Sequence, residues 1–500
     1  MATVMLNTRE LESYQQFLKI KSLPTFSIQG RMATFPDEYA SMLGIKTKPT
    51  GKEFHVESEF LFDYQRDIAE MAIRKQKFCI FADCGLGKTL MYIEFIKAAM
   101  RDLGKKKGIL IVSPIMVIDQ TLSEAERWYG MGDVIERIAA RDLNSWLATC
   151  GGKIGITNYE AIKSDLERGA LGGLVLDESS MLKSHYGKWG TKLVELGRGL
   201  QWKLAGTGTP APNDRIEYAN HAVFMDESPT VNAFLARYFV NRGQTGERWE
   251  LKKHALRPFY RSMSHWCIFL TDPATYGWND NTTGTLPPIK TTIHQVDLTA
   301  EQERIAYNLT GTLFANEIGG ITSRSQMGSI AKGWYKGKSV KSNKSAYIKQ
   351  LVESWPDEST IIWCIYNKEQ ELIGEQFPDA AYLTGTTPYT ERMNLVDEFK
   401  RGDRRVLISK AKILGFGLNL QVATRQVFSG LQDSYEAFYQ CVKRSNRIGS
   451  TKPLNVHIPV TDLERPMIET VLKKASRVQD DAREQELIFK SQLQSGITSC

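Results

Sequence analysis

Short apolar runs alternate with amphipathic, helix-like stretches along most of the 500-residue chain. In the first half of the chain, such runs lie at 78–81, 108–114, 153–159, 173–179 and 202–208. A continuous apolar run of this length is typical of a strand that is buried on both faces, and helices between such strands favour parallel pairing. We therefore predict an α/β fold with a parallel sheet, whose ligands bind at the carboxyl ends of the strands.

A second alternating series begins near residue 344. Its expected helices are 345–354, 368–377, 390–402 and 434–447, and its expected strands are 360–366, 380–385, 404–410, 425–430 and 455–460. The same reasoning predicts a second α/β lobe. At roughly 100 to 200 residues per domain, the chain length suits about three units, some of which are insertions.

Two glycines and a lysine follow the first predicted strand, at the point where a helix begins. Gly85 and Gly87 allow backbone N–H groups to close around an anion at the helix N-terminus. In a nucleotide-binding P-loop, Lys88 would reach the β- and γ-phosphates and the Thr89 hydroxyl would bind Mg²⁺. Ala82 replaces the usual first glycine. The alternative is an ordinary strand–turn–helix corner in which the glycines serve tight packing.

An acidic pair follows another strand of the first series. Asp177 could hold Mg²⁺, and Glu178 could orient and deprotonate an attacking water. This strand could be the neighbour of the strand that precedes the glycine loop. The alternative for an acidic pair in this position is a helix cap.

A polar cluster marks the last helix of the second series. Gln440, Arg444 and Arg447 are spaced four and three residues apart, which predicts that they share one helical face. Arginines in this array could stabilise charge on a transferring γ-phosphate. A solvated basic helix is the alternative.

The composition is that of a globular protein, with 42% hydrophobic and 24% charged residues. No apolar run approaches the roughly 18 residues that a membrane helix needs, and the start of the chain has no signal-peptide pattern. The seven cysteines are scattered without a C-x-x-C pair, so neither a disulfide framework nor a zinc site is indicated. We expect a monomer without membrane partners in the cytoplasm of a bacterium or of a phage-infected cell.

The formal net charge of +7 permits an anionic partner, but the distribution of charge is more informative than the total. Residues 318–352 contain no acidic residue. Lysines interleaved with Trp334 and Tyr335 suit a phosphate backbone, and the glycines and serines around them indicate a flexible surface segment. The lysines expected to contact nucleic acid are Lys332, Lys336, Lys338, Lys341 and Lys344. The alternative is a solvated charged linker.

Taken together, ordered motifs across residues 58–460 resemble those of the superfamily 2 helicases, and most closely the Swi/Snf-type DNA translocases. The segment "LFDYQRDIAEM" resembles the Q motif, "ADCGLGKT" motif I, "VSPIMVIDQ" motif Ia, "ITNYEAI" motif Ib, "DESS" motif II and "GTGTPAPN" motif III. Further along, "GFGLNLQVA" resembles motif V and "QCVKRSNRIG" motif VI. In motif II, Ser180 replaces the histidine of the common Asp-Glu-x-His form, a difference that concerns the coupling of motif II to motif III.

The resemblance implies an ATP-hydrolysing motor with two RecA-like lobes, helical insertions and an ATP cleft between the lobes. The implied cofactors are ATP and Mg²⁺, and the implied metal ligands are Thr89 and Asp177. The implied catalytic residues are Lys88, Glu178, Arg444 and Arg447. Gln65 would read adenine. The other implied nucleotide contacts are Ala82, Asp83, Cys84, Gly85, Leu86, Gly87, Lys88 and Thr89.

The expected organisation has a first and a second lobe with accessory parts. The expected boundaries are 1–57 for an N-terminal accessory segment, 58–290 for the first lobe with a helical insertion at about 214–275, 291–343 for a helical and basic insertion, 344–460 for the second lobe and 461–500 for a helical tail. In the tail, an apolar stripe from Ile468 to Val478 predicts docking on the second lobe.

The expected function is ATP-dependent translocation on nucleic acid, most naturally double-stranded DNA. One alternative is a helicase that separates strands of DNA or RNA, for which Trp334 and Tyr335 are the nearest candidates for a wedge. The other alternative is a DNA-binding clamp that ATP gates with little turnover. A clamp needs neither a water activator nor an arginine finger, so Glu178 and Arg447 argue against it.

Overall fold

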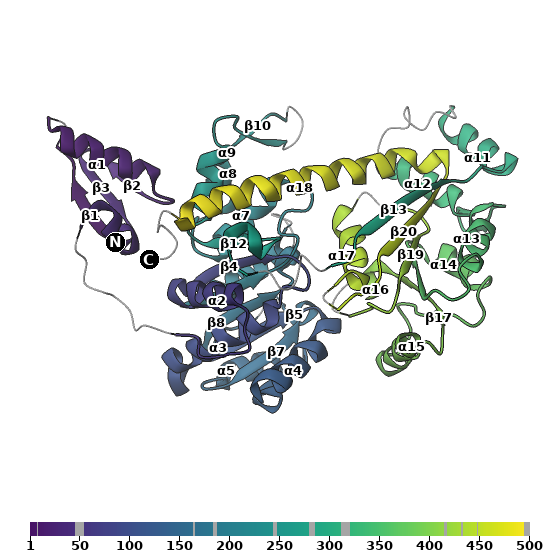
Figure 1. The fold of residues 1–500 in the computed structure, drawn as a ribbon, viewed down its shortest axis with the longest axis horizontal. Coiled ribbons are helices and arrows are strands. Elements are labelled where there is room, and N and C mark those ends of the chain that lie inside the picture. The colour runs from purple at the N-terminus through teal and green to yellow at the C-terminus, as the bar shows by residue number, and fades with distance from the viewer. Residues whose placement is uncertain are drawn as a thin grey trace. The chain divides into compact units, whose positions relative to one another are not determined.

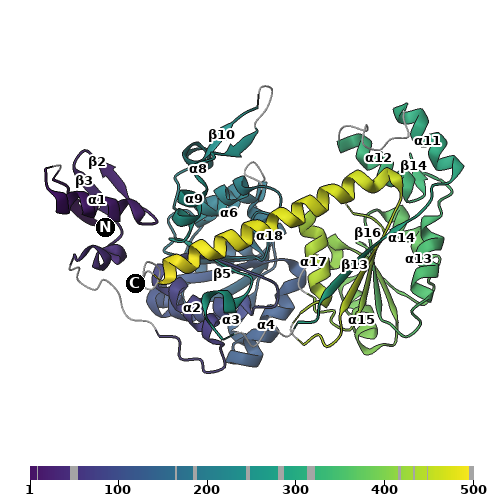
Figure 2. The same cartoon turned by 45° about the horizontal axis from the view of Figure 1, so that its top comes forward.

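The computed structural model describes residues 1–7, 9–45, 55–163, 166–183, 188–243, 248–279, 286–311, 321–414, 418–431, 434–447 and 449–494. The chain divides into two compact units: unit 1 comprises Met1–Asp280 with Gln479–Cys500, and unit 2 comprises Asn281–Val478. Each unit contains a central sheet with helices around it (Figures 1 and 2). In the part of the chain that the structure describes, no helix has both the length and the apolar character needed to cross a membrane.

A seven-stranded sheet forms the centre of unit 1, with the strand order β12-β4-β9-β8-β5-β7-β6. Its strands are β4 (Lys77–Ala82), β5 (Gly108–Ser113), β6 (Ile135–Arg137), β7 (Ile154–Asn158), β8 (Leu171–Asp177), β9 (Trp202–Gly206) and β12 (Cys267–Leu270). All neighbouring strands pair in parallel. Every residue of β5, β8 and β9 is buried, which explains their continuous apolar sequences. The predicted parallel α/β sheet is therefore confirmed.

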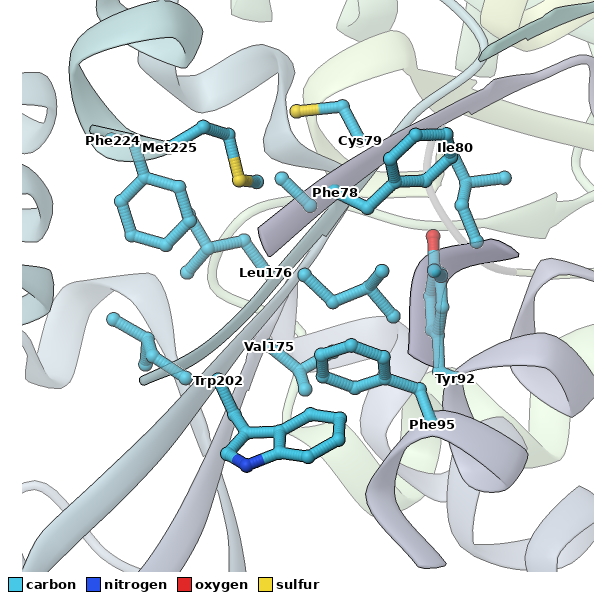
Figure 3. Close-up of a cluster of buried hydrophobic side chains, with 14 of the residues drawn as sticks. Phe78, Cys79, Ile80, Tyr92, Phe95, Val175, Leu176, Trp202, Phe224 and Met225 are labelled. Atoms are coloured by element: carbon cyan, nitrogen blue, oxygen red, sulfur yellow. The ribbon is translucent and has the colours of Figure 1, made fainter. Parts of the chain in front are cut away.

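Helices pack against this sheet and fix the position of its carboxyl edge. The helices of unit 1 beyond residue 60 are α2 (Asp63–Lys75), α3 (Lys88–Leu103), α4 (Ile115–Tyr129), α5 (Leu143–Thr149), α6 (Lys188–Gly197), α7 (Tyr218–Phe224), α8 (Val231–Tyr238), α9 (Leu256–Met263) and α10 (Pro273–Tyr276). On α3, the ring of Phe95 meets the ring of Trp202 on β9 edge-on at 5.2 Å (Figure 3). Val175 and Leu176 of β8 belong to the same buried cluster. The loop between β4 and α3 is thus anchored on both sides by packed elements.

Two smaller sheets complete unit 1. Near the N-terminus, β1 (Ala2–Met5), β2 (Ser27–Gln29) and β3 (Met32–Phe35) form an antiparallel sheet in the order β1-β3-β2, accompanied by α1 (Leu11–Ser22). Contacts tie this part to the rest of unit 1: Lys75 pairs with Glu38 at 2.6 Å, and the Tyr39 hydroxyl lies 2.6 Å from Nδ1 of His265. Between α8 and α9, β10 (Phe239–Asn241) and β11 (Trp249–Leu251) form an antiparallel hairpin. The insertion expected to be helical therefore also contains strands.

Unit 2 contains a six-stranded sheet with the order β13-β20-β19-β16-β18-β17, in which all neighbouring strands are parallel. The strands are β13 (Ile289–Gln295), β16 (Thr360–Cys364), β17 (Ala381–Tyr382), β18 (Val406–Lys410), β19 (Arg425–Phe428) and β20 (Leu454–Val460). The helices are α11 (Ala300–Thr310), α12 (Ile321–Ala331), α13 (Lys344–Glu353), α14 (Asn367–Gly374), α15 (Tyr389–Arg401), α16 (Ala411–Leu414) and α17 (Tyr435–Ser445). The predicted second α/β lobe is confirmed, and both units are RecA-like parallel-sheet lobes.

The order of strands in unit 1 differs from one expectation. The strand that ends at Asp177 was expected to be a possible neighbour of the strand before the glycine loop. Instead, β9 lies between β4 and β8 and pairs with both. The two polar loops still share an edge of the sheet, because the carboxyl ends of parallel strands lie on the same side.

The basic segment 318–352 is an ordered part of unit 2 rather than a flexible segment. Beyond 318–320, which lie outside the described residues, it forms α12, a hairpin of β14 (Trp334–Tyr335) and β15 (Lys338–Ser339), and most of α13. Its aromatic residues pack inward, since the ring of Trp334 meets that of Tyr366 at 5.4 Å. Glycines and serines were therefore a poor guide to flexibility here.

The C-terminal helix α18 (Arg465–Gln494) contributes to both units. In its unit 2 part, Ile468 and Val471 of the predicted apolar stripe are buried, whereas Leu472 is 42% exposed. In its unit 1 part, the ring of Phe489 meets that of Phe269 edge-on at 5.3 Å. The stripe from Ile468 to Val478 did not predict this second set of contacts.

Candidate functional site

The loop between β4 and α3 has the geometry of an anion-binding turn. Gly85 and Gly87 have φ angles of 90° and 70°, which side-chain-bearing residues rarely adopt, and α3 begins immediately afterwards. Nζ of Lys88 lies 2.8 Å from the carbonyl oxygen of Ala82 and 3.2 Å from that of Asp83. The ammonium group thus folds back over the loop, where phosphate oxygens could replace the two carbonyls as its acceptors.

Gln65 supports this loop from α2. Its side chain is buried; Nε2 donates to the carbonyl of Leu86 at 3.2 Å, and Oε1 accepts from the N–H of Phe62 at 3.1 Å. A Cβ atom at position 87 would collide with Nε2 of Gln65, so a side chain there would displace the Gln65 amide from the loop. The adenine contact implied for Gln65 stays a prediction, and the structure gives its amide a role in holding the loop.

β8 brings Asp177 and Glu178 to the same edge of the sheet, and both are buried. The Asp177 carboxylate accepts hydrogen bonds from Oγ of Ser113 at 3.1 Å and from the N–H of Glu178 at 3.0 Å. Burial and the neighbouring Glu178 charge raise the pKa of Asp177 to about 7, and the Lys88 ammonium opposes the rise. Asp177, Glu178 and Lys88 therefore lie within electrostatic reach of one another.

Glu178 is held by residues that follow other strands. Its Oε2 accepts from Oγ1 of Thr207 at 3.2 Å, and the N–H of Thr209 donates to the same Thr207 hydroxyl at 3.2 Å. Its φ of 52° is unusual for a residue other than glycine, a kind of strain that often occurs at functional sites. Sequence reasoning did not identify Thr207 or Ser113. Both lie at strand ends, so the rule that found Asp177 would have found them too.

A histidine outside the sequence motifs contacts motif II. His221 on α7 is fully buried, and its Nε2 lies 3.1 Å from Oγ of Ser179. Burial lowers the pKa of His221 to about 4, so the imidazole is neutral at neutral pH. Ser180, which replaces the histidine of the common motif, directly follows Ser179 in the sequence and is also buried. An imidazole therefore reaches motif II from α7, through a contact between residues 42 positions apart that no local pattern reveals.

The arginines of the second lobe occupy two different environments. Gln440 and Arg444 share a face of α17 as predicted: Nη2 of Arg444 donates to Oε1 of Gln440 at 2.8 Å, and Arg444 is 2% exposed. α17 ends at Ser445, so the half-buried Arg447 lies in the loop that follows. The prediction that all three share one helical face is wrong for Arg447. In motif V, Gly417 lies outside the described residues.

Two of the five lysines expected to bind nucleic acid are structural. Lys332 and Lys344 are buried, with 1% and 3% of their side-chain surface exposed, and both form ion pairs with the buried Glu464. Burial alone would raise the pKa of Glu464, but the two ammonium groups lower it to about 2. The expectation that Lys332 and Lys344 contact nucleic acid is therefore wrong, because both ammonium groups pair with a buried carboxylate far along the chain. The exposed lysines are Lys336, Lys338 and Lys341.

ATP with Mg²⁺ fits the groups at the edge of the unit 1 sheet. Lys88 and the loop N–H groups suit phosphates, and the oxygens of Thr89 and Asp177 are of the type that Mg²⁺ prefers. A divalent cation would also offset the buried negative charge of Asp177 and Glu178. The buried Tyr92 hydroxyl, close enough for these charges to raise its pKa, has no hydrogen-bond partner among the described residues, which suits a bound water.

Comparisons with known proteins agree with this arrangement. The family described as "SNF2-related domain" matches residues 64–351, and the family "Helicase conserved C-terminal domain" matches residues 343–449. A similar curated protein is the ATP-dependent RNA helicase RhlB of Escherichia coli O1:K1, which is 27% identical over 126 residues that cover 24% of this chain and 30% of RhlB. RhlB of Klebsiella pneumoniae strain 342 is 26% identical over the same extent. The match thus spans less than a third of the length of these curated relatives.

A solved structure with similarity to the chain is the Sulfolobus solfataricus SWI2/SNF2 ATPase core in complex with dsDNA. It is 20% identical, with a TM-score of 0.40, and the alignment covers 87% of this chain and 97% of that one. The SNF2-related match alone extends over more than half of this chain and contains the P-loop, Asp177 and Glu178. The chain therefore belongs to the SNF2-related domain family of superfamily 2, with a helicase C-terminal domain in its second half, as the order of its motifs predicted.

Proposed function

We propose that the chain is a nucleic-acid-dependent ATP hydrolase that moves along double-stranded DNA. The observation that carries the proposal is the grouping of Lys88, Asp177 and Glu178 at one edge of the unit 1 sheet. A cation for the phosphates, a ligand for Mg²⁺ and a base for water are the parts that phosphoryl transfer requires. Family membership supports the same chemistry.

In the proposed reaction, Lys88 and the loop N–H groups hold the β- and γ-phosphates of ATP. Thr89 and Asp177 would hold Mg²⁺, which would supply positive charge to offset the charge that develops on the phosphates. Glu178 orients the attacking water and accepts its proton on the carboxylate. Thr207 keeps that carboxylate in place through its hydrogen bond to Oε2.

The second half of the chain supplies the proposed arginine finger. Arg447 is the better candidate, because the guanidinium of Arg444 already bonds Gln440 within α17. We expect Arg447→Ala to keep nucleotide affinity and to lose stimulated hydrolysis by a factor on the order of 10³ or more. Arg444→Ala should instead lower stability, since it removes a buried hydrogen-bonded side chain. Equal and large losses of stability in both variants would contradict the assignment of a catalytic role to Arg447 and a structural role to Arg444.

The packing of Trp334 and Tyr335 favours movement along duplex DNA over strand separation. Trp334 and Tyr335, the nearest candidates for a wedge, are half-buried, and Trp334 packs edge-on against Tyr366. Neither is presented as a free ring that could split a base pair. The exposed lysines that we propose for phosphate contact in this region are Lys336, Lys338 and Lys341.

The ATPase rate on different nucleic acids tests the proposal. The protein is assayed with single-stranded DNA, duplex DNA, forked DNA and RNA at one salt concentration, since backbone binding depends steeply on salt. We expect the highest rate on duplex DNA, together with displacement of a third strand from a triplex and little unwinding of a fork. Lys88→Ala is the inactive control. Stimulation by RNA alone, a property that the RhlB relatives make worth testing, or efficient fork unwinding would refute the duplex assignment.

A further inference from the structure

The two strands of the hairpin between α8 and α9 lie outside the motifs quoted above, and a charged surface surrounds them. Figures 1 and 2 both show β10 extending away from the central sheet of unit 1 beyond α8 and α9. Residues 231–261 contain seven arginines and lysines and only two acidic residues. Five of these cations are exposed and form what we term the hairpin patch: Arg237, Arg242, Arg248, Lys253 and Arg257.

The base of the hairpin is a rigid aromatic cluster. Phe234 and Tyr238 of α8 and Phe239 of β10 all pack around Phe259 of α9, with ring centroids 5.3 to 5.9 Å from that of Phe259. Lys252 adds a cap to α8, because its Nζ donates to the carbonyls of Ala236 at 2.7 Å and of Arg237 at 3.1 Å. The protrusion is therefore held mainly by its apolar base and by Lys252, with Arg237 stacked over the ring of Tyr238 at 5.1 Å.

The charge of the patch is only weakly balanced. Glu250 on β11 pairs with Arg242 at 3.0 Å and with Arg248 at 3.2 Å, so within the described part of the hairpin one carboxylate serves two arginines. The side chains of Arg242 and Arg248 are 59% and 76% exposed, and pairs this exposed add little stability. Like charges gathered on a small protrusion oppose folding slightly, so their concentration calls for an anionic partner.

The chemistry of the patch favours phosphodiester groups. Four of its five members are arginines, and the guanidinium fork matches phosphate oxygens in two-point contacts. An acidic protein is the rival partner, but the proposed function places nucleic acid in constant contact with this chain. Cations spread over α8, the hairpin and α9 also suit an extended, regularly charged backbone better than a single acidic site.

We propose that the hairpin patch binds the phosphate backbone of nucleic acid, as a contact surface of unit 1 additional to Lys336, Lys338 and Lys341 of unit 2. The inference rests on the proposed function for the identity of the ligand, and it does not depend on ATP hydrolysis. Because phosphate contacts carry no base information, binding through the patch is independent of sequence.

The test measures the affinity for a mixed-sequence DNA duplex at several salt concentrations, without nucleotide. The variant Arg242→Ala/Arg248→Ala/Lys253→Ala should bind more weakly than the parent protein at low salt. The slope of log affinity against log salt should become shallower by roughly 0.9 for each lost contact, or about 2 to 3 in total. Glu250→Gln, which releases two arginines from their carboxylate, should shift affinity in the opposite direction.

The matched control is Lys105→Ala/Lys106→Ala/Lys107→Ala. These three lysines are also exposed and also belong to unit 1, but they precede β5 at the amino edge of the sheet. The control removes the same charge and should leave the slope unchanged. The conservative variant Arg242→Lys/Arg248→Lys should keep most of the slope, and melting temperatures should match because all these side chains are exposed.

The outcomes separate the inference from the proposed function. An unchanged slope in the hairpin variant, or an equal loss in the lysine control, overturns the hairpin patch as a nucleic-acid surface even where DNA still stimulates hydrolysis. If no nucleic acid stimulates ATP hydrolysis by the parent protein, the proposed function fails. If the salt dependence of DNA affinity nevertheless becomes shallower in the hairpin variant alone, the hairpin patch still binds nucleic acid.

Discussion

The molecule contains two buried clusters of charged side chains: carboxylates predominate in one, and lysines predominate in the other. At the edge of the unit 1 sheet, the carboxylates of Asp177 and Glu178 are adjacent, and burial with that repulsion raises the pKa of Asp177 to about 7. In unit 2, Glu464 lies between Lys332 and Lys344, whose charges overcome burial and lower its pKa to about 2. All three carboxylates are buried. Burial alone therefore does not set the direction of the shift, which depends on the balance of nearby charges.

The comparison separates a functional cluster from a structural one. In the unit 2 cluster the one carboxylate bonds both lysines, so its negative charge is fully paired, and the cluster joins the segment after β20 to the end of α12 and the start of α13. The unit 1 cluster leaves negative charge under-compensated, which a bound cation and phosphate group would relieve. Loss of a charge should therefore affect turnover in unit 1 and stability in unit 2.

The largest expected effect is on turnover in Glu178→Gln. The carboxamide fills the same space but cannot accept a proton, so hydrolysis should fall by about 10² to 10⁴-fold while ATP binding persists. The melting temperature should not fall, because the substitution removes repulsion with Asp177. Glu195→Gln, at an exposed position on α6, is the control. Near-normal steady-state hydrolysis by Glu178→Gln would remove Glu178 from the proposed mechanism.

The next effect is on stability in Glu464→Gln. This change leaves Lys332 and Lys344 buried without their counter-charge, which typically costs about 3 to 5 kcal/mol in the free energy of unfolding. Denaturant unfolding followed by a probe in unit 2 measures it, with Glu469→Gln, at an exposed position on α18 shortly after Glu464, as the control. Replacing all three charges, as Lys332→Met/Lys344→Met/Glu464→Leu, should cost less than the single change. A single variant as stable as the parent protein would show that the cluster is not structural.

A smaller effect of the same cluster should be visible as a dependence of stability on pH. The pKa of Glu464 is about 2 in the folded state, against 4.5 as its ordinary value. The stability due to its charge is thus complete above pH 4.5 and is lost as pH falls from 4.5 towards 2, by up to about 3 kcal/mol. Other carboxylates titrate in this range, so the quantity to measure is the difference between the parent protein and Glu464→Gln. That difference should shrink as pH falls, and a constant difference would contradict the assignment.

The smallest expected effect concerns His221 and its contact with Ser179. Removing one buried hydrogen bond costs about 1 kcal/mol, and if the contact couples motif II to α7, His221→Ala should lower the ratio of stimulated to basal hydrolysis roughly fivefold. His221→Gln, which can place an amide nitrogen near the position of Nε2, should restore much of the ratio. A loss of thermal stability with an unchanged ratio in both variants would make His221 a packing residue only.

Sequence reasoning succeeded where local pattern and chemistry coincide. The buried strands of both lobes have continuous apolar sequences, and polar residues directly after them, such as Asp177, are placed at the edge of the sheet by the geometry of parallel strands. Edge strand β13 was missed, because most of its side chains are exposed and its sequence, "IKTTIHQ", has no continuous apolar run. The position of β9 between β4 and β8 could not be predicted either, because pairing between strands that are distant in the chain leaves no local signal in the sequence.

The incorrect expectations for Lys332 and Lys344 have one physical cause. A lysine in a segment without acidic residues is normally solvated, and nothing near Lys332 or Lys344 in the sequence signals that Glu464, 132 and 120 positions away, pairs with both. The contact between His221 and Ser179 is hidden for the same reason. In each case the deciding partner is remote in the chain, so only the folded structure identifies it.

The return of α18 to unit 1 has a consequence for how the chain matures during synthesis. Residues from Gln479 onward complete unit 1: the Gln485 amide reaches the Tyr218 hydroxyl, Glu486 accepts from Thr271, and Phe489 covers Phe269. A nascent chain that has already released all strands of unit 1 from the ribosome therefore still exposes apolar surface around Phe269. That surface stays open until about two hundred further residues have been translated, an interval of roughly 10 to 40 s at rates of about 5 to 20 residues per second. During this time chaperones, rather than the chain itself, would have to protect the first lobe from aggregation.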